Sequence, residues 1–167
     1  QPCALPIYRR RKVRIPCEAG VAFDGFVFIP DPDRRNGRTI LTPHGHGMRY
    51  LEVSGVRRAK FPRGNQCGPY LSNYTERLAQ QGFVTACFNE RGFDDRNDSR
   101  DGRHICTELD VTYRICGYTL IRMHMADIHR VADYLETLDC VDPDRIGLAG
   151  PSGGGALTWL TGAVEDR

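Results

Sequence analysis

The sequence predicts an α/β protein in which a mainly parallel sheet is covered by helices on both faces. From residue 38 onward, short β-rich runs alternate with helical segments, and this alternation is typical of parallel sheets. The last β-rich run, 145–149, leads into a glycine-rich turn and then an apolar segment that can pack under the sheet. We treat residues 1–167 as a single domain, because a chain of this length can bury a sizeable core.

Five strands are predicted from β-branched and aromatic runs that end at turn residues. In chain order they are 13–18, 21–30, 38–42, 83–88 and 145–149. The first two are expected to pair antiparallel, and Pro30 ends the second. Asn36-Gly37 predicts the turn that precedes the third strand. The later strands are expected to lie parallel to one another, because helices connect them.

Three helices are predicted, at 70–81, 118–139 and 155–163. The second has the clearest period, since its apolar residues from Leu120 to Leu138 fall on one face. Gly82 is expected to end the first. Residues 48–69 show no clean period and predict a long excursion, and residues 89–117 predict a polar loop region.

Charge and composition give no reason to expect a nucleic-acid or membrane partner. The chain has 23 Lys and Arg against 21 Asp and Glu, a net charge of +2. No stretch has the apolar length that a membrane span needs, and no apolar leader is visible, so a cytoplasmic location is expected. The seven cysteines contain no C-x-x-C pair, which favours free thiols, although Cys106 and Cys116 could pair in an oxidising compartment. The sequence leaves the oligomeric state open.

Residues 150–154, Gly-Pro-Ser-Gly-Gly, match the pattern G-x-S-x-G of a nucleophile elbow. In such an elbow the serine lies on a sharp turn between a strand and a helix, and small neighbours avoid a Cβ clash. Ser152 is therefore the candidate catalytic nucleophile. A dinucleotide-binding loop is disfavoured by the glycine spacing, and a P-loop is disfavoured because no Lys follows Gly155.

The loop after the third strand, His44-Gly45-His46-Gly47, has the H-G-x-G form of an oxyanion loop. Acyl transfer places negative charge on the former carbonyl oxygen, and two preplaced N–H groups stabilise that charge. We expect these donors to be the backbone N–H groups of Gly153 and His46, with Gly47 as the alternative to His46. The His44 side chain is expected to be structural. A metal-binding H-x-H pair is disfavoured, because the sequence shows no further cluster of ligands.

Four segments together resemble the N-terminal half of an α/β-hydrolase, closest to the dienelactone hydrolase and acetyl xylan esterase-like group. They are 42–47, 89–93, 119–138 and 141–155. The resemblance implies a Ser-His-Asp hydrolase that cleaves a small-molecule carboxylic ester without a metal or organic cofactor. Ser152 departs from the dienelactone hydrolases proper, which use Cys as the nucleophile.

The resemblance also implies that the catalytic His and Asp follow the serine in the chain. They are therefore expected beyond residue 167, and these residues alone are expected to be an incomplete domain with little activity and a tendency to self-associate. His104, His124 and His129 precede Ser152 and are expected to be surface or helix-packing residues. The alternative function is a non-catalytic α/β-hydrolase-like binding module or a truncated pseudoenzyme.

Overall fold

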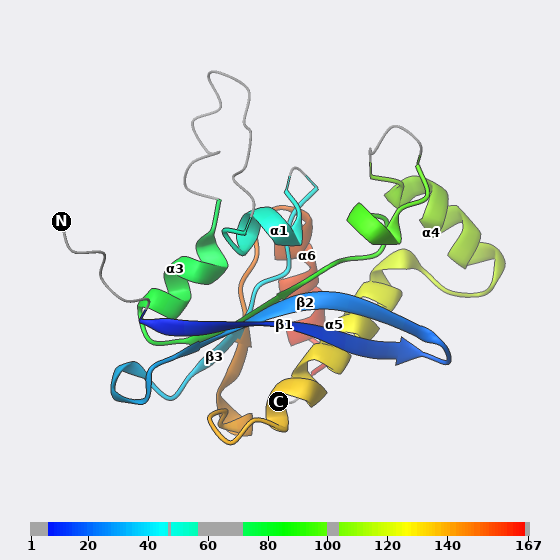
Figure 1. Ribbon diagram of the computed structural model, residues 1–167. Coiled ribbons are helices and arrows are strands. Elements are labelled where there is room, and N and C mark those ends of the chain that lie inside the picture. The colour runs from blue at the N-terminus through cyan, green and yellow to red at the C-terminus, as the bar shows by residue number, and fades with distance from the viewer. Residues whose placement is uncertain (1–6, 47, 57–71, 100–103, 166–167) are drawn as a thin grey trace.

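The computed structural model describes residues 7–46, 48–56, 72–99 and 104–165 (Figure 1). The strands in these ranges are β1 (Tyr8–Glu18), β2 (Val21–Pro30), β3 (Thr39–Leu41), β4 (Val84–Phe88) and β5 (Ile146–Leu148). The α-helices are α1 (Tyr50–Val53), α3 (Tyr74–Gln80), α4 (Cys106–Ile115), α5 (Leu120–Glu136) and α6 (Gly153–Gly162). Short 3-10 turns lie at Pro32–Arg34, Asp94–Arg96 and Pro143–Arg145. None of the described helices is both long enough and apolar enough to cross a membrane.

The five strands form one mixed sheet in the order β1-β2-β4-β3-β5. β1 pairs antiparallel with β2, as predicted, and β2 pairs antiparallel with β4. β3 lies parallel to both β4 and β5, so that Thr39 is opposite Val84 on one side and Ile146 on the other. The predicted α/β class is confirmed. The three parallel strands β3, β4 and β5 end at a common edge of the sheet.

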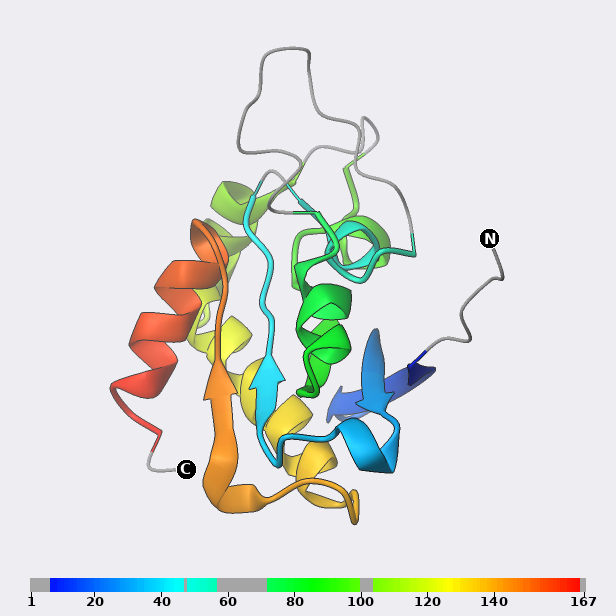
Figure 2. The same ribbon diagram turned by 90° about the vertical axis from the view of Figure 1, so that its left-hand side faces the viewer.

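Helices cover both faces of the sheet, as Figure 2 shows from the side. Alternate residues of β2 point to opposite faces, which is the two-residue period of a strand. Val27 and Ile29 pack in a core with α5 and α6, whereas Phe26 and Phe28 pack in a second core with α1 and α3. This two-sided burial explains why β2 and β4 consist almost entirely of apolar residues.

Helix α5 confirms the long helix that the apolar period predicted. The Thr119 hydroxyl caps its first turn by accepting a hydrogen bond from the backbone N–H of Arg122 at 3.3 Å. Its buried apolar residues form a stripe that faces the sheet: Leu120, Ile128, Val131, Ala132 and Leu135. Since burying such a side chain stabilises the fold by about 1.5–3 kcal/mol, α5 contributes substantially to the core on its face of the sheet.

The expectation of a polar loop over residues 89–117 is wrong, because Cys106–Ile115 form the helix α4. None of its residues is buried, and its apolar side chains Val111 and Ile115 are 56% and 82% exposed. Its half-buried residues Cys106, Leu109 and Tyr113 lie three and four positions apart, which makes only a short stripe among polar neighbours. Sequence reasoning did not recognise this stripe as a helix. In the predicted excursion at 48–69, α1 occupies the start, and residues 57–69 lie outside the described ranges.

Candidate functional site

Three loops meet at the carboxyl edge of the parallel strands. They follow β3, β4 and β5, and they are 42–46, 89–93 and 149–152. Ligands bind at this edge in open α/β sheets, because the loops that follow the strands converge there. The edge therefore unites the oxyanion-type loop, the Asn-Glu-Arg-Gly-Phe segment and the turn that carries Ser152.

Ser152 lies in the sharp turn between β5 and α6 and has φ of +53° and ψ of −118°. A positive φ is uncommon for a residue with a side chain and costs of order 1–3 kcal/mol. The side chain is exposed, and Ser152 is the last residue before the first turn of α6. The strand–turn–helix geometry expected around this serine is thus present, with the side chain held outside the helix.

The glycines around Ser152 let the turn lie directly against the loop after β3. A Cβ on Gly150 would come 2.4 Å from the carbonyl oxygen of Pro43, and a Cβ on Gly154 would come 2.3 Å from the same oxygen. Real Cβ atoms do not approach backbone so closely. The small residues of the G-P-S-G-G segment are therefore required by contact between two loops as well as by the turn itself.

Replacing Gly154 by alanine is expected to displace the turn and to destabilise the protein by about 1–3 kcal/mol, the usual cost of overpacking. The matched control is Gly162→Ala at the other end of α6, where an added Cβ meets no atom within 4 Å. That change is expected to be neutral or stabilising by about 0.5–1 kcal/mol. Urea unfolding of both variants gives the difference, and equal costs would contradict the packing argument.

The loop after β3 is fixed from two sides. The Tyr74 hydroxyl of α3 donates a hydrogen bond to the Pro43 carbonyl at 2.6 Å, and the backbone N–H of His44 donates to the Glu90 carboxyl at 2.7 Å. Thr42 continues the ladder with a backbone bond to the Ala86 carbonyl at 2.8 Å. These contacts hold His44 to His46 beside the Ser152 turn, where a Cβ on Gly45 would lie 3.0 Å from the Ser152 Cβ.

Three buried titratable groups lie under this loop. Burial lowers the pKa of His44 to about 3 and that of His124 to about 4, and it raises the pKa of Glu90 to about 8. The His44 ring packs edge-on against Phe93 with centroids 4.7 Å apart, and the His124 Nε2 lies 3.1 Å from the Arg91 carbonyl oxygen. Both histidines are therefore neutral near pH 7 and serve as packing groups. Because they are buried, neither can act as an exposed general base.

These shifts predict a stability maximum near pH 6.5. Below that pH, unfolded His44 and His124 bind protons that the folded protein does not, so stability falls as the pH drops towards 4. Between pH 4.5 and 8, folded Glu90 keeps a proton that the unfolded chain releases, so stability falls as the pH rises. Each unmatched proton changes the free energy of unfolding by at most about 1.4 kcal/mol per pH unit.

Glu90→Gln is expected to remove the decline between pH 6.5 and pH 8, because the amide keeps an oxygen for the His44 N–H and does not ionise. The acid side of the profile, which comes from the histidines, should remain. Urea unfolding at half-unit steps of pH measures both limbs, and an unchanged alkaline limb in the variant would show that Glu90 is not its cause.

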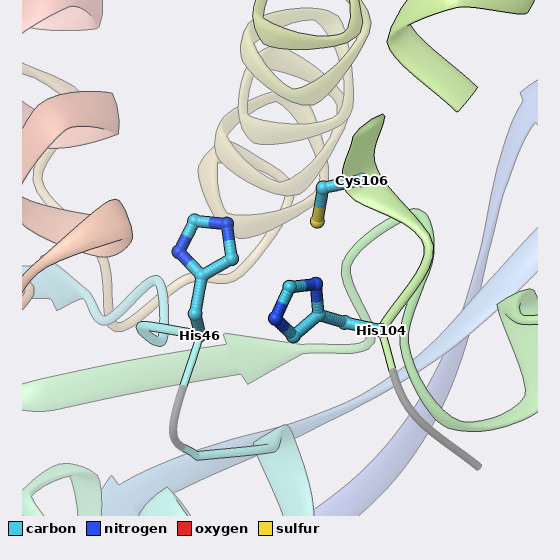
Figure 3. A group of neighbouring side chains, drawn as sticks. All are labelled: His46, His104 and Cys106. Carbon is cyan, nitrogen blue, oxygen red and sulfur yellow. The ribbon is translucent and has the colours of Figure 1, made fainter. Parts of the chain in front are cut away.

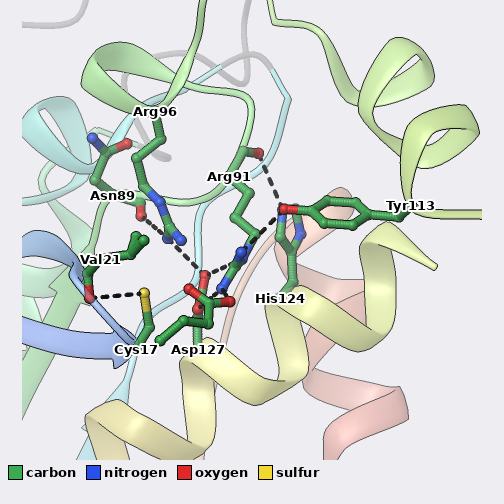
Figure 4. Close-up of polar contacts among 9 residues, drawn as sticks. Cys17, Val21, Asn89, Arg91, Arg96, Tyr113, His124 and Asp127 are labelled. Carbon is green, nitrogen blue, oxygen red and sulfur yellow. Dashed lines mark hydrogen bonds and ion pairs between the residues drawn. The ribbon is translucent and has the colours of Figure 1, made fainter. Parts of the chain in front are cut away.

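A buried ionic network fixes the loop after β4 to α5 (Figure 4). The Asp127 carboxylate accepts hydrogen bonds from Arg91 at 2.9 and 2.7 Å and from Arg96 at 2.6 Å. Arg91 also bonds Glu18 at 2.5 Å and the Tyr113 hydroxyl at 3.0 Å, so the network ties β1, α4 and α5 together. Buried charges are costly unless they are paired, so moving Arg91 or Arg96 away from Asp127 would be unfavourable. The network therefore fixes the path of the segment that carries Glu90.

His46, His104 and Cys106 converge above the carboxyl edge (Figure 3). The rings of His46 and His104 have centroids 4.9 Å apart, and both lie beside Phe93. The His46 ring also lies over the start of α6, because a Cβ on Gly153 would meet its Nδ1 at 2.9 Å. Partial burial and the neighbouring His104 lower the pKa of His46.

A cavity of about 480 Å³ opens between α4, α5 and α6 at this edge. His46 and Gly153, the two expected oxyanion donors, are part of its wall, together with Glu90 and Cys106. The rest is largely apolar and includes Phe93, Val111, Leu120, Ile121 and Leu157. An apolar hollow with a few convergent polar groups beside a strained serine is what a small-molecule site requires.

The structure brings the predicted residues Ser152, Gly153 and His46 together at one edge, whereas the alternative donor Gly47 lies outside the described residues. His129 lies on α5 and pairs with Glu165 at 3.1 Å, and His124 packs inside the helix layer, as expected. Sequence reasoning missed the role of Glu90, which supports the oxyanion-type loop from below. Its place directly after a buried strand was the available signal, since carboxyl ends of strands carry functional residues.

The five cysteines in the described ranges are all free thiols, including Cys106 and Cys116, which begin and follow α4. The disulfide that the sequence left open between these two is therefore not formed here. Cys87 is buried in the core, as its apolar context indicated.

Comparison with known proteins identifies the fold. No protein-family model matches the chain. A curated protein of Bacillus subtilis (strain 168), "Putative hydrolase YtaP", is 26% identical over 133 residues, which cover 77% of this chain and 40% of that protein.

Solved structures with the same fold include two acetyl xylan esterases. One, from Bacteroides fragilis and described as putative, matches 95% of this chain and 42% of its own with a TM-score of 0.78 at 17% identity. Another, from Paenibacillus sp. R4, matches all of this chain and 48% of its own with a TM-score of 0.64 at 20% identity. A putative dienelactone hydrolase from Klebsiella pneumoniae has a TM-score of 0.59 at 18% identity, with coverage of 95% and 55%.

The chain therefore has the α/β-hydrolase fold, and the predicted resemblance to the dienelactone hydrolase and acetyl xylan esterase-like group is confirmed at the level of the fold. It spans about two fifths of the length of the Bacillus subtilis protein and about half or less of the two esterases.

Proposed function

We propose that the protein is a serine hydrolase that cleaves a carboxylic ester through an acyl-serine intermediate. The observation that carries the proposal is the position of Ser152. It is an exposed serine with positive φ, held between β5 and α6 at the carboxyl edge, and the next residue, Gly153, is part of the cavity wall. Strain of this kind persists where the surrounding structure enforces it, and it clusters at functional sites.

In this mechanism the Ser152 hydroxyl attacks the ester carbonyl carbon while a general base takes its proton. The oxyanion that forms accepts hydrogen bonds from the N–H groups of Gly153 and His46. Gly153 is the first residue of α6, so its N–H has no partner within the helix and is available to a ligand. The alcohol then leaves with the proton, and water hydrolyses the acyl-serine by the same steps.

We assign the general base and its orienting acid to a His and an Asp beyond residue 167. Three of the described histidines are consistent with this assignment: His44 and His124 are buried and neutral, and His129 of α5 is paired with Glu165. The solved α/β-hydrolases that match are about twice as long as this chain, which leaves room for both residues in a full-length protein.

A fluorophosphonate probe tests the proposal, because it phosphonylates only an activated serine. In the full-length protein, the probe is expected to label Ser152, as measured by intact mass and by the mass of the peptide that contains the turn. Absence of labelling in a folded full-length protein would instead support the non-catalytic binding module.

A further inference from the structure

His46, His104 and Cys106 form a group of metal-ligand side chains that the fold assembles from two distant segments (Figure 3). One ligand atom from each lies within 4.8 Å of the others. His46 comes from the loop after β3, and His104 and Cys106 come from the segment that leads into α4. Neither hydrolysis by Ser152 nor packing of the core uses the side chains of this group.

We propose that these three residues bind a divalent transition metal ion of the Zn²⁺ type, with a fourth coordination position open to the cavity. Two imidazoles and a thiolate favour Zn²⁺, Co²⁺ or Cu²⁺ and disfavour Mg²⁺ and Ca²⁺, which prefer oxygen ligands. Three protein ligands and one open position are typical of zinc sites that also hold water or a substrate.

The geometry requires only a small closure. Bonds of about 2.0–2.1 Å to nitrogen and 2.3 Å to sulfur place tetrahedral ligand atoms roughly 3.3–3.6 Å apart. The group must therefore close by roughly 1 Å from its present spacing, which rotation of the exposed rings of His46 and His104 can supply. Burial raises the pKa of the Cys106 thiol to about 11, so the metal ion displaces a proton when it binds.

Within the described parts of the chain, the group of ligand atoms consists of His46, His104 and Cys106. His44 is only two positions from His46, but its ring is buried under the loop against Phe93, so the H-x-H pair itself does not form the site. The Phe93 ring also lies beside the rings of His46 and His104, with its centroid 5.9 Å from that of His46 and 5.7 Å from that of His104. This apolar wall limits access of water on one side of the ligands.

The metal ion would lie close to the reaction. His46 and Cys106 share the cavity wall with Gly153, and the His46 ring covers the start of α6 next to Ser152. A bound Zn²⁺ is therefore expected to inhibit ester hydrolysis by obstructing the cavity, and Cys106→Ser or His104→Ala is expected to relieve that inhibition. This consequence, unlike the binding itself, rests on the proposed function.

Titration of the full-length protein with Co²⁺ tests the binding directly, since a cobalt–thiolate bond gives a charge-transfer absorption band. We expect one equivalent of Co²⁺ to produce the band, excess Zn²⁺ to abolish it and excess Mg²⁺ to leave it unchanged. Cys106→Ser should remove the band. His104→Ala should weaken Co²⁺ binding at least about tenfold, because even the loss of an outer-shell partner has that effect.

Two matched variants separate this site from other thiols and from catalysis. Cys116→Ser changes an exposed thiol at the other end of α4 and should leave the band intact. The Ser152→Ala variant should bind Co²⁺ with the same affinity as the unmodified protein. Metal binding can therefore be measured independently of any ester hydrolysis. A missing band, a band that survives Cys106→Ser, or one lost in Cys116→Ser would overturn the proposal. Circular dichroism verifies that each variant is folded. If the Cys106 variant misfolds, the Co²⁺ affinity of the His104→Ala variant decides the outcome, because His104 is exposed.

Discussion

Ser152→Ala is expected to reduce the kcat of the full-length protein towards an activated ester, such as p-nitrophenyl acetate, by roughly 10⁵–10⁶-fold. The substitution removes the atom that would form the acyl intermediate and leaves the rest of the site in place. It should also abolish labelling by the fluorophosphonate. Initial rates at saturating ester, with burst kinetics for the acyl intermediate, measure the effect.

The residual rate of this variant is informative, because oxyanion donors and substrate binding still accelerate hydrolysis by water about 10³–10⁴-fold in serine enzymes. Ser99→Ala, in the loop after β4, is the matched control and should leave kcat unchanged within a factor of about two. A Ser152→Ala protein that keeps most of its rate would exclude the proposed nucleophile and leave the fold assignment untouched.

Asp127→Asn is expected to lower the free energy of unfolding by about 3–5 kcal/mol, the usual cost of breaking a buried ionic network on one side. The side chain is 1% exposed and accepts hydrogen bonds from both Arg91 and Arg96. Without its charge, the largely buried Arg91 keeps Glu18 as a carboxylate partner, and Arg96 keeps a hydrogen bond to the Asn89 carbonyl oxygen. Urea or thermal unfolding measures the loss.

The control for this prediction lies on the same helix. Asp133 pairs with Arg130 at 3.2 Å in solvent, where side chains are about half exposed, and such pairs contribute about 0–1 kcal/mol. Asp133→Asn should therefore cost far less than Asp127→Asn. Similar costs at the two positions would mean that the buried network contributes little to stability.

Much of the fold could be predicted because its central elements carry strong local patterns. α5 has a regular apolar stripe, β2 and β4 are apolar runs bounded by turn residues, and the Gly-Pro-Ser-Gly-Gly turn falls between a strand and a helix. α4 was missed, since none of its residues is fully buried and its half-buried residues Cys106, Leu109 and Tyr113 form only a short stripe. For β1, the strand was predicted at 13–18, and only its first five residues, 8–12, were missed, because on this edge strand they are mostly charged and exposed.

The site divides along the same line. Ser152, Gly153 and His46 could be proposed from the sequence because they lie in short motifs, in which the spacing of glycines reflects a local turn. The partners of Asp127 and the grouping of His46 with Cys106 depend on contacts across the fold, and no spacing in the sequence encodes them. Sequence reasoning disfavoured a metal-binding H-x-H pair because no further cluster of ligands is evident in the sequence, whereas the fold brings His104 and Cys106, which are distant in the chain, next to His46.

The pairing of β5 with β3 has a consequence for how the protein folds. Thr39 is opposite Ile146, so this contact closes a loop of more than half the chain, and contacts of that kind form slowly. The β1–β2 hairpin and α5 can form earlier from local contacts. The turn at Ser152 reaches Pro43 only after β5 has docked, so the edge that carries Ser152 is expected to be among the last parts to form. Recovery of fluorophosphonate labelling should therefore lag behind recovery of the helical signal during refolding.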